Sequence, residues 1–526
     1  MTMPNQMPHR VTVPLPHPKP LLKPPVYAAL GMAASYYAYP FLSSLSFGGF
    51  LFWSTLFFFA LIIALLKVLC TFPLGKSLSP SAFLCLKRLS IIVAAAAIGF
   101  SLGFAARKTV TSHVETGIMH ERITAVSGTL YQDPRTLFSG AGLGVLRLSE
   151  CYGEDGLRVS SSGNLSVFFP AESVPHIKEF GRGCFIYAEG TFTNTNRGTV
   201  FRADSVHLVT QAPPIQQFRT GLRLTLTEKL QNRSAAVNAD YALPVWGGFA
   251  QAMLLGARDD LTEEFSQAFF NSGCSYILAL SGMHLAIISA VLSFLIRRPL
   301  GIRGASLAGA LFIIFYVFIA GSQASLVRAA IMYLIGTFAI WGFFKKCVLS
   351  ILSMAFIIQL MFQSHSGITL SFILSYLALA GMITLGQTFF SLFSGRLPEI
   401  IARGLSASLG AFIATAPIVA LVFGSLKPVG IIAGLVIAPL ASLFLVLSLA
   451  ALATAFLPVP LWNIFDFSLS LLYRLLEFVV SSAGYVPGIT VHSPVPVLFI
   501  SAFLWLFVLF IKKQDDVYRS SLASFG

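Results

Sequence analysis

Charge is scarce in this 526-residue chain. Only 11% of its residues are Asp, Glu, Lys or Arg, whereas a soluble domain carries about 25%. Apolar residues make up 56% of the chain instead, and the mean hydropathy is +0.79. Apolar stretches of about 18 residues or more, the length that lets a helix cross a bilayer, recur along it. This composition excludes an ordinary soluble domain and indicates a polytopic α-helical membrane protein.

Cysteine is also sparse, and its spacing argues against a zinc site. The six cysteines form no Cys-x-x-Cys pair and no cluster with histidine, so we expect no metal and no other cofactor. The N-terminal arm, residues 1–25, lacks an apolar core and contains eight prolines. It therefore predicts a disordered segment rather than a signal peptide.

The apolar stretches fall into two helical blocks. The first block, 26–106, predicts spans near 26–45, 48–70 and 89–106. The second block, 274–512, is followed by a short tail, 513–526, and predicts spans near 274–296, 304–320, 326–344, 348–362, 369–390, 405–424, 428–456 and 494–512. Residues 459–484 fit either an interfacial helix or a further crossing, which leaves the side of the C-terminus open.

Basic residues gather in alternate loops between these spans. They occur within 67–88, 297–303 and 345–346, which the positive-inside rule places in the cytoplasm. The net charge of +14 fits the same rule, although affinity for nucleic acid is the alternative explanation.

Residues 107–210 have a different composition, with ten basic and ten acidic residues. Alternating segments such as ITAVSGTLY and CFIYAEGTF, separated by Gly- and Asn-rich turns, are typical of strands. A domain of this size fits a small barrel or sandwich, and an OB-like fold is among them. The order of spans places the domain outside the cytoplasm. Disulfides form there, so Cys151 and Cys184 are a disulfide candidate, with two buried free thiols as the alternative.

The segment 211–273 has the period of a helix. An apolar stripe repeats every four residues, at Phe218, Leu222, Leu226 and Leu230. Arg219 and Arg223 lie off this stripe, which predicts an amphipathic helix on the membrane surface or a plain linking helix. Further on, the capping-box spacing of Asp260 and Glu263 predicts the start of another helix, which runs toward Gly273.

The second block contains no Asp or Glu between residues 265 and 398, but it contains seven Lys or Arg. One of them, Arg328, lies at the start of a predicted span. A charge inside a membrane is costly and usually faces a partner or a cavity. An anion in transit would explain Arg328, and so would a side chain that snorkels to the lipid headgroups.

A second polar feature lies upstream, where Gly282 accompanies Ser281 and His284. These two residues are three apart, so we expect them on one helical face. Three explanations are open: a broken or polar helix that lines a pathway, a core histidine bonded between helices, or a hydrolase with Ser281 as nucleophile and His284 as base. The sequence offers neither an orienting acid nor a Gly-x-Ser-x-Gly elbow for the third.

The stretch MLLGARDDLTEEFSQAFFNSGCSYILALSGMHLAII resembles the signature of the ComEC family, the competence proteins that pass DNA through the inner membrane. The matching positions are Gly256, Arg258, Gly273, Ser275, Ala279, Ser281, Gly282 and His284. The later segment GSQASLVRAAIM is similar to another family segment, and it matches at Gly321, Ser325, Arg328 and Ala329. LSFILSYLAL and FIATAPIVALVFGSL resemble two more. The order of helices, OB-like domain and membrane domain is also similar.

The sequence departs from the family pattern in three ways. Tyr276 stands where the family usually has His, and Gly434 stands where it has Asn before a Pro-containing segment. Long members also carry a C-terminal metallo-β-lactamase-like domain, whereas this sequence stops at Gly526 without an HxHxD motif. We therefore expect no nuclease activity, and no other enzyme activity, from this chain.

The resemblance implies a channel component of the inner membrane that takes up single-stranded DNA during natural transformation. It implies lipid, an external DNA receptor and a cytoplasmic helicase or DNA-binding protein as partners, and it leaves a homo-oligomer open. Basic, hydrogen-bonding walls without carboxylates would suit a phosphate backbone. The alternatives are a transporter of another anionic polymer or a small anion, and the hydrolase built on Ser281 and His284.

Overall fold

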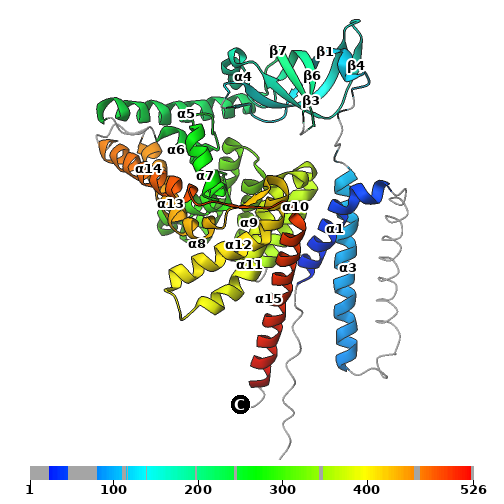
Figure 1. Ribbon diagram of the computed structural model, residues 1–526, viewed down its shortest axis with the longest axis vertical. Coiled ribbons are helices and arrows are strands. Elements are labelled where there is room, and N and C mark those ends of the chain that lie inside the picture. The colour runs from blue at the N-terminus through cyan, green and yellow to red at the C-terminus, as the bar shows by residue number, and fades with distance from the viewer. Residues whose placement is uncertain are drawn as a thin grey trace, which may run out of the picture.

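The computed structural model describes residues 23–44 and 80–522, apart from 109, 111–113, 115, 138, 196–197, 242–245, 343–346 and 455–461. The predicted span 48–70 and most of the predicted N-terminal arm lie outside the described residues. Within them, a small β domain stands apart from a large set of helices (Figure 1). The predicted fold class, a polytopic helical membrane protein with a separate β domain, is confirmed.

The β domain is a closed ring of five strands. They are β1 (Ile123–Leu130), β3 (Gly142–Gly153), β5 (Asn164–Phe169), β6 (Phe185–Thr195) and β7 (Gly198–Thr210). Strand β1 pairs with β6, β6 with β7, β7 in parallel with β5, β5 with β3, and β3 again with β1. Two short strands, β2 (Arg135–Thr136) and β4 (Arg158–Ser160), join β3, and helix α4 (Val174–Phe180) precedes β6. A five-stranded Greek-key barrel of this kind is OB-like.

Every second side chain along the strands points inward and helps to fill the barrel. In β5, buried and partly exposed residues alternate, which places Leu165, Val167 and Phe169 inside. Strand β6 changes register at Gly190, where a Cβ atom would lie 1.9 Å from the carbonyl oxygen of Arg202. Only glycine fits this bulge, which lets the strand bend around the barrel.

The disulfide prediction is wrong, because Cys151 and Cys184 are free and buried thiols. Cys151 pairs with Val126 of β1, whereas the carbonyl of Cys184 accepts the N–H of Leu130 four residues further along. Four residues of strand span about 13 Å, whereas bridged Cα atoms lie about 4.4–6.8 Å apart. Burial raises the pKa of both thiols, which makes them poor nucleophiles.

The helices of the membrane part begin with α1 (Pro24–Ser44) and α3 (Pro80–Lys108), which pack against each other. The later helices are α5 (Pro214–Tyr241), α6 (Gly247–Leu255), α7 (Glu263–Asn271), α8 (Gly282–Ala320), α9 (Ala324–Ile340), α10 (Val348–Phe362), α11 (Leu370–Phe393), α12 (Glu399–Phe423), α13 (Val429–Thr454), α14 (Trp462–Gly484) and α15 (Pro494–Leu522). The chain also contains a small sheet of β8 (Ser425–Leu426) and β9 (Ile489–Thr490).

Among the described residues, five helices are long and apolar enough to cross a membrane: α8, α11, α12, α13 and most of α14. The inclusion of α14 favours a crossing over an interfacial helix for residues 459–484. Four shorter apolar segments lie in α3, α9, α10 and α15. Helix α15 continues through Leu522, so part of the predicted tail is helical.

Helix α8 is two spans rather than one. Its 39 residues would extend about 58 Å as one straight helix, roughly twice the hydrocarbon thickness. Gly301 breaks it with a φ of +66°, two residues after Pro299. Leu285 and Ile288 of the first half pack with Ile313 and Tyr316 of the second half, so the chain folds back on itself at Gly301.

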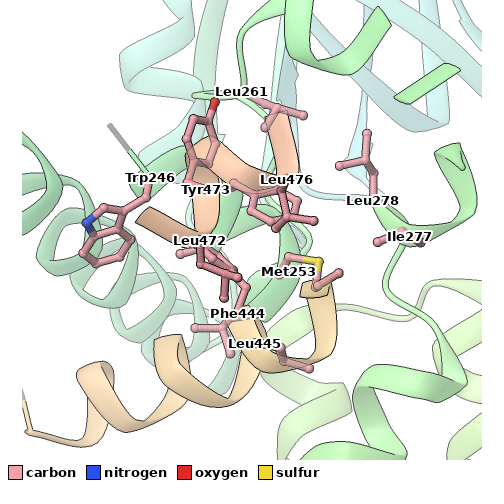
Figure 2. Close-up of a cluster of buried hydrophobic side chains, with 14 of the residues drawn as sticks. Trp246, Met253, Leu261, Ile277, Leu278, Phe444, Leu445, Leu472, Tyr473 and Leu476 are labelled. Carbon is pink, nitrogen blue, oxygen red and sulfur yellow. The ribbon is translucent and has the colours of Figure 1, made fainter. Parts of the chain in front are cut away.

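A buried apolar cluster joins α6, α7, α13 and α14 and holds these helices together. Figure 2 shows Met253 of α6, Phe444 of α13 and Leu476 of α14 within it. Leu222 and Leu226 of α5 pack against this cluster, and Leu230 belongs to it. These contacts account for most of the predicted apolar stripe.

Two details of the segment 211–273 differ from the sequence prediction. Phe218 is 61% exposed while Arg219 is buried, because Arg219 pairs with a carboxylate of the β domain. Helix α7 is capped by Thr262, whose side chain accepts the N–H of Phe265, and not by Asp260. The helix begins at Glu263, so its N-cap lies two residues after the N-cap that the sequence predicted.

Candidate functional site

The helix that the sequence predicts from residue 274 begins only at Gly282. Residues 275–277 form a short 3₁₀ turn, and Ser281 is the extended N-cap of α8. Ser281 and His284 form a capping box in which the backbone N–H of Ser281 donates to Nδ1 of His284 over 3.2 Å. The prediction that Ser281 and His284 lie on one face of a helix is therefore wrong, because Ser281 lies outside the helix. In the structure, α8 begins at Gly282 after a short 3₁₀ turn.

His284 is fully buried, and the protein occupies both of its ring nitrogens. Nδ1 lies 3.0 Å from Oγ of Ser281, and Nε2 lies 3.2 Å from the sulfur of Met253. A hydrolase would need a carboxylate on the far side of the imidazole to orient it, whereas a thioether stands there. These contacts favour a structural role for His284 at the start of α8.

Arg328 is the centre of a second group of polar contacts. Its guanidinium donates to Oγ of Ser375 and lies 5.7 Å from the ring centroid of Tyr376. Its Nη2 would lie 3.5 Å from a Cβ atom at Gly282, so the charge stands against the first turn of α8. Only 7% of Arg328 is exposed. Snorkelling to the headgroups needs an exposed guanidinium, so the structure excludes that explanation.

The N-terminal ends of α8 and α9 meet beside this arginine. Oγ of Ser325, in the first turn of α9, donates to the carbonyl of Leu280, just before α8 begins. Helix N-termini carry partial positive charge and are natural binding sites for anions. Within the described residues no ion pair includes Arg328, and its Nε atom has no hydrogen-bond partner. The site is buried and positive, and among the described residues no carboxylate forms an ion pair with Arg328.

A chain of hydrogen bonds fixes the start of α9 from α10 and α11. The amide nitrogen of Gln359 donates to the carbonyl of Ala324 over 2.9 Å, and the hydroxyl of Tyr376 donates to the oxygen of Gln359 over 2.8 Å. Sequence reasoning did not single out Gln359, Ser375 or Tyr376. Two of them lie in the segment LSFILSYLAL, so a signal was present, whereas Gln359 stands alone in an apolar run.

Gly256 brings a third motif segment to the same place. It ends α6 with a φ of +68°, and a Cβ atom there would lie 2.7 Å from both Gln323 and Leu280. The glycine thus fits between the start of α9 and the break before α8. Of the predicted site residues, the structure gathers six around this point: Gly256, Ser281, Gly282, His284, Ser325 and Arg328.

Three other predicted residues lie elsewhere. Gly273, with a φ of +73°, ends the turn after α7 and packs against the backbone of Lys427 before α13. Ser275 opens the 3₁₀ turn and is exposed. Arg258 is exposed at the junction with the β domain, where its neighbour Asp259 accepts the N–H of Thr136 over 3.0 Å.

The two single-residue departures from the family pattern meet in space. A Cβ atom at Gly434 of α13 would lie 2.8 Å from the hydroxyl of Tyr276. The side chain of Tyr276 therefore occupies the room that any larger residue at 434 would need.

These features define a multi-pass membrane protein with an OB-like barrel and a buried positive site at the N-terminal ends of α8 and α9. The chain matches the family described as Competence protein over residues 253–515, half of its length, and it belongs to that family. This is the family of ComEC-like proteins that the sequence motifs resemble, so the recognition is confirmed.

Two curated proteins are also similar to parts of this chain. An uncharacterized protein of Aquifex aeolicus is 27% identical over 229 residues, which cover 43% of this chain and 52% of that protein. The ComE operon protein 3 of Bacillus subtilis is 30% identical over 168 residues, 31% of this chain and 21% of that protein. The chain thus spans about half of one relative and a fifth of the other. No solved structure matches it.

Proposed function

We propose that this protein forms the channel through which single-stranded DNA crosses the inner membrane during natural transformation. Membership of the Competence protein family supports DNA as the cargo. The observation that carries the mechanism is the buried Arg328, which forms no ion pair within the described residues, at the point where the N-termini of α8 and α9 meet. One phosphate charge per nucleotide has to cross a region of low dielectric constant, and a fixed positive site lowers that barrier.

The residues around Arg328 have distinct roles in this proposal. Arg328 attracts the phosphate, while Ser375 and Tyr376 hold the guanidinium in place. Ser281 and His284 fix the first turn of α8, so that its backbone N–H groups point at the anion. None of these steps makes or breaks a covalent bond, so we infer that the chain acts without catalysis.

The wider arrangement follows from the same proposal. The barrel lies on the external side and receives DNA from a surface receptor, and a cytoplasmic helicase or DNA-binding protein draws the strand inward. Basic loops such as 297–303 face the cytoplasm. Lipid surrounds the apolar helices, and identical subunits are a further class of partner that this arrangement allows.

The test replaces Arg328. In a naturally transformable host that depends on this protein, Arg328→Gln should reduce entry of labelled DNA into the DNase-protected fraction by at least tenfold, while DNA bound at the cell surface stays unchanged. Arg328→Lys should keep part of the uptake, because a compact ammonium still attracts phosphate. The matched control is Arg303→Gln, which removes the same charge from an exposed position and should leave uptake near normal.

Each variant also needs a folding control, such as a single monodisperse peak in detergent gel filtration. Normal uptake by well-folded Arg328→Gln protein would overturn the proposed role of this site.

A second function, transport of a small anion, is favoured by the same observation, because one arginine at a helix N-terminus suits a single phosphate. Flux of labelled phosphate into vesicles that exclude oligonucleotides would support that alternative.

A further inference from the structure

The junction between the barrel and the helices holds a second cluster of charges, separate from Arg328. Asp133, in the loop after β1, receives hydrogen bonds from Arg219 over 2.9 Å and from Arg223 over 2.6 Å. Arg219 also donates to the carbonyl of Phe318, at the end of α8. One carboxylate of the barrel is thus held by two arginines of α5, and α5 runs from the barrel alongside α6 and α14 (Figure 1).

The second carboxylate of the junction is Asp259, on the loop after α6. One of its oxygens accepts the backbone N–H of Thr136 of β2, and the other pairs with Lys178 of α4 at 3.0 Å. Both carboxylates of the cluster are therefore engaged with partners that join the barrel to the helices.

Three arginines of the junction have no carboxylate in the ion pairs of the described residues: Arg135, Arg182 and Arg258. The bond from Thr136 to Asp259 brings their direct neighbours Arg135 and Arg258 close together, and both are exposed. Arg182 donates to Ser322 over 3.4 Å and stands 5.6 Å from the ring centroid of Tyr131. Tyr131 is itself 38% exposed.

We infer that Arg135, Arg182, Arg258 and Tyr131 form a binding site for the phosphates and bases of a single strand at the mouth of the helical bundle. Grooves for single-stranded nucleic acid combine basic side chains along the backbone with aromatic rings on which bases stack. The cluster has six basic side chains against two carboxylates, and two of the unpaired ones, Arg135 and Arg258, face solvent. That the ligand is single-stranded DNA rests on the proposed function, whereas the surplus of positive charge at the junction follows from the ion pairs of the structure.

The binding test uses the full chain in nanodiscs and a fluorescein-labelled oligonucleotide of about twenty thymidines. The double variant Arg135→Gln/Arg258→Gln should weaken binding at least tenfold. It should also reduce the slope of log affinity against log salt by about 1.4, the value for two phosphate contacts on a single strand. Tyr131→Ala should weaken binding about fivefold or more, while Tyr131→Phe keeps the stacking and most of the affinity.

The matched control is Arg147→Gln/Arg202→Gln, which removes two exposed arginines from the barrel wall, on β3 and β7. It should leave affinity within about twofold and the salt slope unchanged. The conservative double variant Arg135→Lys/Arg258→Lys should retain most of the binding, which guards against loss of fold. Equal weakening by the wall variant, or an unchanged junction variant, would overturn the inference.

The outcomes also separate this inference from the proposed function. An unmodified protein that does not bind the oligonucleotide would overturn both. If the unmodified protein binds it and uptake in cells depends on Arg328, but the junction variant binds normally, then only the junction site is wrong.

Discussion

At the scale of single residues, the site depends on how much room each position leaves. Gly256 allows the start of α9 and the chain before α8 to approach, and Gly434 makes room for Tyr276. The sequence reveals Tyr276 and Gly434 as two unrelated departures from a family pattern. Their contact depends on how the turn after α7 packs on α13, which no local pattern encodes.

We expect Gly434→Asn to destabilise the protein by about 1–3 kcal/mol, because an inserted side chain would overpack the hydroxyl of Tyr276. Adding Tyr276→His should recover part of that loss, since the shorter ring frees the space. Thermal unfolding in detergent measures both variants. The matched control is Gly336→Asn in α9, where a Cβ atom meets nothing within 4 Å. Equal losses at 434 and 336, or no recovery in the double variant, would contradict the coupling.

At the scale of secondary-structure elements, the long apolar runs predicted the positions of the described helices well, whereas the polar residues between them predicted the helix ends poorly. The alternating segments of residues 107–210 predicted strands, and the structure closes them into an OB-like ring. The start of α8 was missed because Ser281 and Gly282 interrupt an apolar run that reads as one helix. The disulfide was wrong because register, which separates Cys151 from Cys184, is set by pairing across the barrel.

The capping box at the start of α8 gives a test that separates a structural serine from a nucleophile. Ser281→Ala removes the cap and should cost about 1 kcal/mol of stability, with reduced DNA uptake. Ser281→Asn supplies another N-cap side chain, so it should restore both stability and uptake. Thermal unfolding and the cellular uptake assay measure the two effects. Uptake that is lost in well-folded Ser281→Asn protein, together with labelling of the unmodified protein by a serine-directed probe, would favour the hydrolase.

At the scale of the whole molecule, charge is divided between the parts. The β domain balances its acids and bases, whereas residues 265–398 of the membrane part carry bases without acids. That separation was visible in the sequence and predicted an anion pathway. The sequence did not show that Arg258, in the same motif as Gly256, belongs to the junction with the barrel. The reason is that Thr136 and Lys178, the partners of its neighbour Asp259, lie far away in the chain.

The attachment of the barrel should depend on pH through Asp133. Burial alone would raise the pKa of Asp133, but the hydrogen bond from Arg219 and the charges of Arg223, Arg219 and Arg182 lower it below its usual range. A lowered pKa in the folded state means that the stabilisation is present above the ordinary carboxylate range and is lost as pH falls through the folded value. The contribution should therefore be constant from neutral to mildly acidic pH and should fade only below about pH 4.

Asp133→Asn removes this contribution at every pH and leaves the buried Arg219 without its charged partner. We expect a loss of about 2–4 kcal/mol near pH 7, somewhat below the value for a fully buried pair because the carboxylate is partly exposed. Hydrogen exchange at the loop after β1 should rise in the variant, and the gap from the unmodified protein should close as the pH falls below about 4. The control is Glu150→Gln, which breaks the exposed pair with Arg158 and should change little. A gap that persists in acid would show that the substitution at position 133 acts through packing and not through charge.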